Sequence, residues 1–185
     1  MRTLKFISFL LICSLPCFGQ DRIDIETSKV FSVLITDKRQ VFLSPQIDTF
    51  LLKEIQKELS KRYFIRRVTT DGALHVDTLS LSNNERKYID SFLTGLASYT
   101  WTNEEMKQNG LTRFILFDKT ETKRIPDFDF IVYQIAKPIF LRSNTIAFTY
   151  YDYACGGLCG HGELSIFIKK DGKWQNWWTI FHTDS

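Results

Sequence analysis

Two cysteines and four of the nine glycines gather in one short segment, Cys155-Gly-Gly-Leu-Cys-Gly-His-Gly-Glu163. Glycine allows positive φ angles and close backbone approach, so this segment can turn tightly. The C-x3-C spacing then lets the two thiols meet if their Cα atoms come within about 5 to 6 Å. The simplest interpretation is a structural disulfide between Cys155 and Cys159, which would close a small ring and fix the shape of the loop.

The same loop has two alternative interpretations. Cys155, Cys159, His161 and His182 would form a Cys2His2 zinc site if the last strand returned beside the loop, because thiolates and imidazoles are preferred zinc ligands. Oxidation would remove two of those ligands, and the spacing matches no common zinc motif, so we expect no metal and no cofactor. A redox-active dithiol is the other alternative, although such pairs usually show C-x-x-C spacing at a helix N-terminus.

Histidine and carboxylate side chains near the loop form candidate acid/base pairs. His161 with Glu163 is one pair and His182 with Asp184 is the other. The sequence contains no G-x-S-x-G, H-E-x-x-H or G-x-x-x-x-G-K-[ST] motif, which leaves elbow hydrolases, zincins and P-loop proteins without support. Residues 157–162 also allow a backbone anion-binding nest. We expect a binding role, and the alternative is a hydrolase-type or zinc-dependent enzyme that uses His161, Glu163 and His182.

The first 19 residues have the features of a secretory signal peptide. Arg2 and Lys5 give a positive start, residues 6–15 are apolar, and residues 17–19 end in small side chains suited to cleavage. The apolar run is too short for a membrane span, which needs about 20 residues, and the rest of the chain predicts no transmembrane segment. We expect cleavage near Gly19 and a secreted or periplasmic single domain of residues 20–185.

Cleavage would also change the cysteine count and the charge. Cys13 and Cys17 would be removed, and Cys155 and Cys159 would be left as partners in an oxidising compartment. Loss of the two basic residues would lower the net charge from +3 to +1. Such a balanced surface argues against nucleic acid as a partner. One local basic cluster remains, which we interpret as a solvated face: Lys57, Lys61, Arg62, Arg66 and Arg67.

The first half of the chain predicts helices with short strands between them. Residues 30–35 and 41–43 are β-branched and apolar and predict paired strands. Ser44-Pro45 and the apolar spacing that follows predict a helix over 45–61. Residues 69–72 predict a turn that joins the strands Tyr63–Val68 and Leu74–Leu79 in a hairpin. Two capping boxes, Ser82–Glu85 and Thr102–Glu105, each predict the start of a helix, and the second helix is expected to be short.

The last seventy residues predict a strand meander. Aromatic and β-branched segments alternate with turn signals over 114–118, 128–135, 144–153, 162–169 and 173–182. Helices first and strands last predict an α+β fold, in which an antiparallel sheet is packed on one face by two N-terminal helices.

The final hairpin could close with a two-residue loop at Asp171-Gly172 or with a three-residue loop. The three-residue loop makes one coherent apolar face, so we place Trp174, Trp178 and Ile180 in the core. The opposite face then carries Phe167, Trp177 and Phe181. These rings could form an open platform for a glycan, peptide or protein ligand, or the N-terminal segment could bury them.

Three segments near the C-terminus have a recognisable pattern: Lys137-Pro-Ile-Phe140, Cys155-Gly-x-Leu-Cys-Gly-x-Gly162 and Lys170-Asp-Gly-Lys-Trp174. Together they resemble the C-terminal part of a group of uncharacterised secreted bacterial proteins. The resemblance spans about a quarter of the chain, from Ala136 to its end. It implies location and no activity, because the group has none assigned. The last hairpin is also similar to the end of many barrels of the nuclear-transport-factor-2 type.

Overall fold

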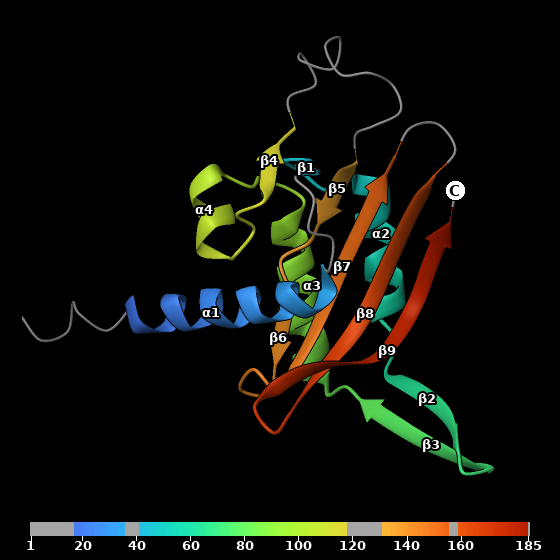
Figure 1. Cartoon of the computed structure of the whole chain (residues 1–185). Helices are drawn as coiled ribbons and strands as arrows, with labels where there is room; N and C mark the ends of the chain where they lie inside the picture. Colours follow the sequence, from blue (N-terminus) through green and yellow to red (C-terminus); the bar gives the residue numbers. More distant parts are fainter. Residues whose placement is uncertain (1–16, 36–40, 118–130, 156–158, 185) are drawn as a thin grey trace, which may run out of the picture.

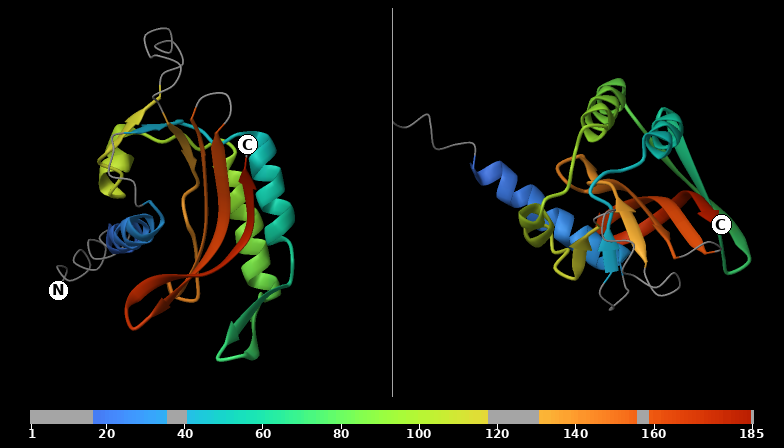
Figure 2. Two further views of the ribbon diagram at one scale, coloured as in Figure 1. Left: turned by 45° about the vertical axis from the view of Figure 1, so that its right-hand side comes forward. Right: turned by 90° about the horizontal axis from the view of Figure 1, so that it is seen from above.

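A curved sheet lies between two helical layers in the computed structural model, which describes residues 17–35, 41–117, 131–155 and 159–184 (Figure 1). Helices α2 (Thr49–Leu59) and α3 (Asn83–Leu96) cover one face, and α1 (Cys17–Leu34) lies against the other with α4 (Asn103–Gln108) (Figure 2). The protein therefore has the expected α+β fold. The sequence predicted helices on one face of the sheet only, and it did not predict the layer that α1 forms on the other face.

The main sheet has seven strands in the order β4-β1-β5-β7-β8-β9, with β6 also paired to β7. The short strand β1 pairs in parallel with both β4 and β5, and the other pairings are antiparallel. A simple meander is therefore wrong for this edge, because an N-terminal strand is inserted between two later ones. The bounds are β1 Val41–Leu43, β4 Phe114–Leu116, β5 Val132–Ile135, β6 Ile139–Leu141, β7 Ile146–Ala154, β8 Gly160–Lys170 and β9 Lys173–Asp184.

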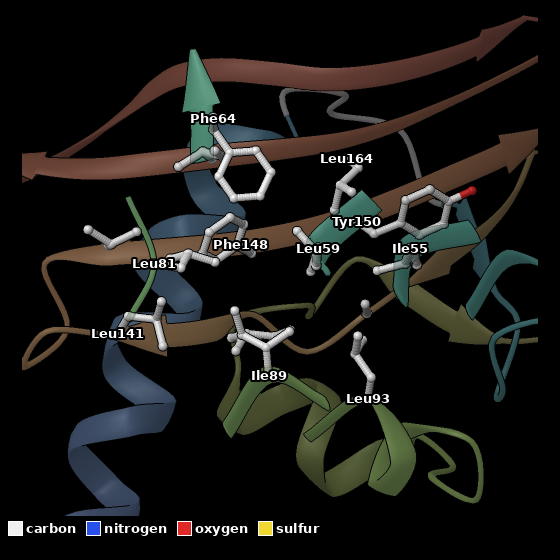
Figure 3. Close-up of a cluster of buried hydrophobic side chains, with 14 of the residues drawn as sticks. Ile55, Leu59, Phe64, Leu81, Ile89, Leu93, Leu141, Phe148, Tyr150 and Leu164 are labelled. Carbon is white, nitrogen blue, oxygen red and sulfur yellow. The ribbon is translucent and has the colours of Figure 1, made fainter. Parts of the chain in front are cut away.

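The main hydrophobic core lies between the sheet and the α2–α3 layer. Ile55 of α2 and Ile89 and Leu93 of α3 pack against Phe148 of β7 and Leu164 of β8 (Figure 3). Both predicted capping boxes are present, at the starts of α3 and α4. Local sequence signals thus fix where these two helices begin, and their apolar stripes fix which face they bury.

Helix α2 begins later than the sequence predicted. Asp48, rather than Ser44, is the N-cap, and its side chain accepts a hydrogen bond from the Phe50 amide at 2.7 Å. The preceding residues form a turn held by distant contacts, since the Pro45 carbonyl accepts from the Trp101 amide at 2.8 Å. A contact so far along the chain has no local signal, so Ser44-Pro45 looked like the helix start.

The predicted strand over residues 30–35 is wrong, because residues up to Leu34 belong to α1. Val30 of this helix packs against Phe167 and Trp174 on the face opposite the main core. The Glu26 carboxylate is buried there and accepts from the Trp174 indole at 2.9 Å and from Lys169 at 2.5 Å. Tertiary contacts thus override the β-branched character of the segment.

The β8–β9 hairpin closes with two loop residues, and the predicted three-residue loop is wrong. Asp171 and Gly172 both have positive φ, 51° and 76°, as a tight hairpin turn requires. Two register shifts follow along the hairpin, between Leu164 and Ser165 and between Ile166 and Phe167. The shift between Ile166 and Phe167 places Trp178 opposite Ile166, the neighbour that the sequence had predicted.

Strands β2 (Tyr63–Thr70) and β3 (Ala73–Ser80) form the predicted hairpin, which projects from the body as a separate two-stranded sheet (Figure 1). The basic cluster runs from the last turn of α2 to this hairpin. Lys57 of α2 pairs with Glu54, and Lys61, which follows the helix, pairs with Glu58. Apart from the half-buried Arg66, the members of the cluster are exposed, as expected for a solvated face. Helices long and apolar enough to cross a membrane are lacking in the described residues.

Candidate functional site

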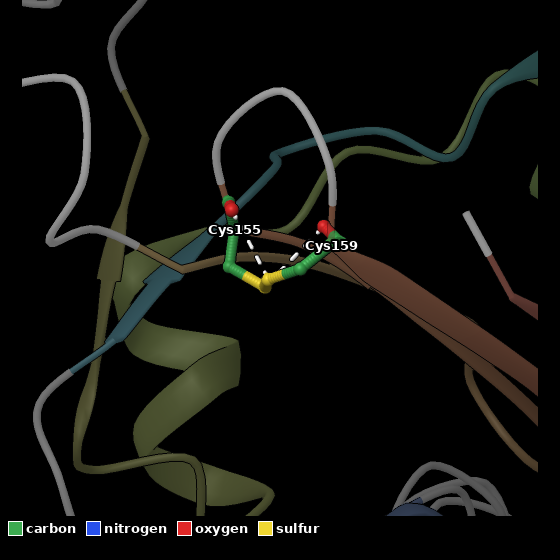
Figure 4. Close-up of a disulfide and its surroundings, with 2 residues drawn as sticks. All are labelled: Cys155 and Cys159. Atoms are coloured by element: carbon green, nitrogen blue, oxygen red, sulfur yellow. Dashed lines mark hydrogen bonds between the residues drawn. A yellow bond between two sulfur atoms is a disulfide. The ribbon is translucent and has the colours of Figure 1, made fainter.

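The cysteine loop joins β7 to β8 at one end of the sheet. Cys155 and Cys159 form the predicted disulfide, with their Cα atoms 5.2 Å apart (Figure 4). The Cys155 amide donates to the Cys159 carbonyl at 2.9 Å, so backbone pairing continues across the bridge. The disulfide uses both thiols, and the alternative Cys2His2 zinc site is therefore not formed. Gly156 and Gly157 lie outside the described residues, and so do residues 157 and 158 of the predicted anion nest at 157–162.

Reduction of this disulfide is expected to lower the free energy of unfolding by about 2 kcal/mol, because a ring of this size restricts the unfolded chain only modestly. For a domain of this length the melting temperature should fall by roughly 4–8 °C. Alkylation followed by mass spectrometry should find no free thiol at Cys155 or Cys159 before reduction and two after it. Two free thiols in protein purified without reductant would contradict the prediction.

The face that α1 partly covers gathers the predicted acid/base residues. The His161 and His182 rings lie with their centroids 6.3 Å apart, nearly parallel, on neighbouring strands. His161 Nε2 is 3.7 Å from Glu163 Oε2. Tyr151 donates to the same carboxylate at 3.4 Å. The structure thus brings together the three residues of the enzyme alternative, whereas the Asp184 side chain lies outside the described part.

The surroundings of Glu163 favour a structural role over proton transfer. Its carboxylate accepts hydrogen bonds from Ser165 and, at 2.9 Å, from Thr179. Burial raises the pKa of Glu163, but these hydrogen bonds and the neighbouring His161 lower it further than burial raises it. A carboxylate that is ionised and already holds several donors is a weak base. Within the described residues, no three His, Cys, Asp or Glu side chains are arranged to hold a metal ion.

An open cavity of about 750 Å³ lies on the other face of the same sheet end. The turn between β1 and α2, the end of β4, and the paired ends of β5 and β7 form its walls. Gln134 of β5 accepts from the Asp48 amide at 2.8 Å and so ties the sheet to the start of α2. The lining residues are Ser44, Pro45, Gln46, Ile47, Asp48, Thr49, Leu116, Phe117, Val132, Gln134, Asp152 and Ala154.

The disulfide adjoins this cavity directly. Ala154 lines the cavity and is followed by Cys155, and Asp152 faces the same side two residues earlier. Burial raises the pKa of Asp152, and a hydrogen bond from the Tyr153 backbone and the nearby His161 only partly offset this effect. The cavity could not be predicted from the sequence, because its walls come from four segments that are distant in the chain. The one local signal was Asp152 among tyrosines.

Of the two alternatives for the aromatic face of the last hairpin, an open platform or burial by the N-terminal segment, the structure shows burial at Phe167. Phe167 is 1% exposed beneath α1, and Trp174 is buried beside it rather than in the main core, so the N-terminal segment buries this face. Trp177 is 9% exposed and belongs to the main core on the other side. Phe181 is half-buried against that same core, next to Tyr150. Bulges in β9 redistribute these rings between the two faces.

Comparison of the chain with protein-family models, curated proteins and solved structures finds no match.

Proposed function

We propose that this protein is a secreted or periplasmic binding domain that holds a small molecule in the cavity beside its disulfide. The main support for this proposal is the cavity itself. Its volume of about 750 Å³ falls within the range of small-molecule sites, about 300–1,000 Å³. Phe117 and Val132 contribute to its apolar lining, together with a few polar groups. That mixture is typical of sites that bury a small organic ligand.

The disulfide supports this role and the location. It directly follows the wall residue Ala154, so it restrains the rim of the cavity where β7 leaves the sheet. Disulfides persist in oxidising compartments, which agrees with the signal-peptide features of residues 1–19. The resemblance of the C-terminal segment to secreted bacterial proteins also supports the location. The enzyme alternative is less favoured, because Glu163 is held ionised by its hydrogen bonds.

Filling the cavity should abolish binding without unfolding the protein. Ala154→Phe places a large ring at the rim from an exposed position, and Ala73→Phe makes the same change on the exposed hairpin far from the cavity. A fragment library of cationic, neutral and anionic compounds can be screened by saturation-transfer NMR against the three proteins. We expect a subset of fragments that lose their signal with Ala154→Phe and keep it with Ala73→Phe. The proposal fails if no fragment shows that difference.

A further inference from the structure

The described lining of the cavity carries negative charge only. It contains two carboxylates, Asp48 and Asp152, and its described residues include no Lys, Arg or His. The positive end of the α2 dipole points here, but Asp48 caps it by accepting from the Phe50 amide. An anionic ligand would meet two carboxylates, whereas a cationic one would be attracted into the cavity.

A buried hydroxyl without a partner lies next to one of these carboxylates. Tyr150 is 1% exposed, and its hydroxyl oxygen has no hydrogen-bond partner. Figure 3 shows this hydroxyl pointing away from the core cluster. Burial, together with the negative charges of Asp152 and Asp48, raises the pKa of Tyr150 well above its usual value, so the hydroxyl stays protonated. A buried polar group of this kind is costly unless something satisfies it.

Three oxygen atoms converge over Gly162, which leaves no side chain between them. A Cβ atom at Gly162 would lie 2.6 Å from Thr183 Oγ1, 3.0 Å from Asp152 Oδ1 and 3.1 Å from the Tyr150 hydroxyl oxygen. One is a carboxylate oxygen and two are hydroxyl oxygens, and each can accept a hydrogen bond. A primary ammonium group has three donors and one positive charge, and so it complements this set in both number and charge.

We propose that the ligand of the cavity is an organic primary amine whose ammonium group binds to the lining carboxylate Asp152 and to the hydroxyls of Tyr150 and Thr183, which lie beside Asp152 around Gly162, just outside the cavity lining. The inference rests on the proposed binding function and names the chemical class of its ligand. The rest of the molecule lies against the apolar wall of Phe117 and Val132. A bare metal ion fits less well, because the described residues offer no cluster of three metal-ligating side chains and the cavity is much larger than an ion.

Three probes with the same ring separate charge from shape: benzylamine, benzyl alcohol and benzoate. Their affinities can be measured by titration while the backbone amide signals of Asp152 and Gly162 are followed by NMR. Calcium chloride is the fourth probe, for a metal ion. We expect benzylamine to bind at least tenfold more tightly than the alcohol, and benzoate and calcium to give no saturable shift at these amides.

Matched variants test the assigned atoms. Asp152→Asn should weaken benzylamine binding about tenfold, and Tyr150→Phe about threefold, because each removes one of the three acceptors or its charge. Asp77→Asn and Tyr63→Phe make the same changes at exposed positions of the β2–β3 hairpin and should leave the affinity unchanged. Thermal unfolding of every variant shows whether a loss of affinity merely reflects a loss of fold.

The outcomes distinguish this inference from the proposed function. If the alcohol binds as tightly as the amine, or if Asp152→Asn has no effect, while Ala154→Phe still blocks binding, the cavity binds ligands but the amine assignment is wrong. If calcium binds at the Asp152 and Gly162 amides and displaces benzylamine, the site is a metal site. If no probe gives a shift that Ala154→Phe removes, the amine assignment fails; if no library fragment gives one either, both proposals fail.

Discussion

Replacing Glu26 by Gln is expected to lower the free energy of unfolding by about 3 kcal/mol, as when a buried ion pair loses one partner. The Glu26 side chain is 8% exposed and lies between Lys29 of its own helix, Lys169 of β8 and the Trp174 indole of β9. Gln keeps the shape but not the charge, so Lys169, whose side chain is 21% exposed, would lose its counter-ion. Chemical denaturation at pH 7 measures the loss.

The loss of stability caused by Glu26→Gln should depend on pH in a defined direction. Burial raises the pKa of Glu26, but hydrogen bonds from Lys169, Lys29 and Trp174 outweigh it and lower the pKa to about 2. A carboxyl group whose pKa is lower in the folded state stabilises the fold above its unfolded pKa, about 4.5, and loses that contribution as the pH falls toward 2. The stability gap between wild type and Glu26→Gln should therefore be full at pH 7 and shrink between pH 4.5 and 2.

An exposed ion pair provides the control for this result. Glu54 pairs with Lys57 on α2 at 3.3 Å, with side chains 41% and 70% exposed. Glu54→Gln should cost less than about 1 kcal/mol, because solvent screens such pairs. A similar loss for both variants, or a Glu26→Gln gap that stays constant down to pH 2.5, would show that the buried network does not anchor α1 to the sheet.

The parts of the fold that were predicted correctly depend on contacts within a few residues. Ser82 with Glu85, and Thr102 with Glu105, satisfy free amides at a helix start, and the residues that do so are three apart in the sequence. The turn at Asp71-Gly72 needs positive φ at both residues, a requirement that the sequence shows directly. Local chemistry is sufficient for such elements.

Helix α1 and strand β1 depend instead on partners far away in the chain. The carboxylate of Glu26 is stabilised by Lys169, 143 residues later, and no local pattern reveals that a buried acid will be neutralised. Strand β1 pairs with β4 and β5, more than 70 residues along the chain. Non-local pairing of this kind overrides the weak propensities of short segments.

In the candidate site, too, some features could be predicted from local sequence and others depend on distant contacts. The disulfide followed from the spacing of Cys155 and Cys159, and the grouping of His161, Glu163 and His182 followed from adjacent strands. The cavity did not follow, because Asp48 and Asp152 meet only after a parallel strand is inserted at the sheet edge. Each residue taken alone looks like an ordinary cap or strand residue, and only the fold makes them walls of one cavity.

Two adjacent tryptophans in β9 should differ in their contribution to stability. Trp177 is 9% exposed within the main core, whereas Trp178 is only partly buried against that core. Trp177→Ala should therefore cost about 3–5 kcal/mol as a core truncation. Trp178→Ala should cost about half as much, since less apolar area leaves water when the protein folds. Equilibrium denaturation of both variants gives the comparison.

The register shift in β9 opposite Ile166 and Phe167 is the physical reason for this order. Without a bulge, a two-residue turn would place Trp177 opposite Ile166 and Trp178 on the α1 side of the sheet. The extra residue instead places Trp178 opposite Ile166 and turns both tryptophans toward the helices α2 and α3. A larger loss for Trp178→Ala than for Trp177→Ala would contradict this packing. A shift of the strand register by one residue would move each side chain to the opposite face of the sheet. Comparing the two tryptophan variants therefore tests the register directly.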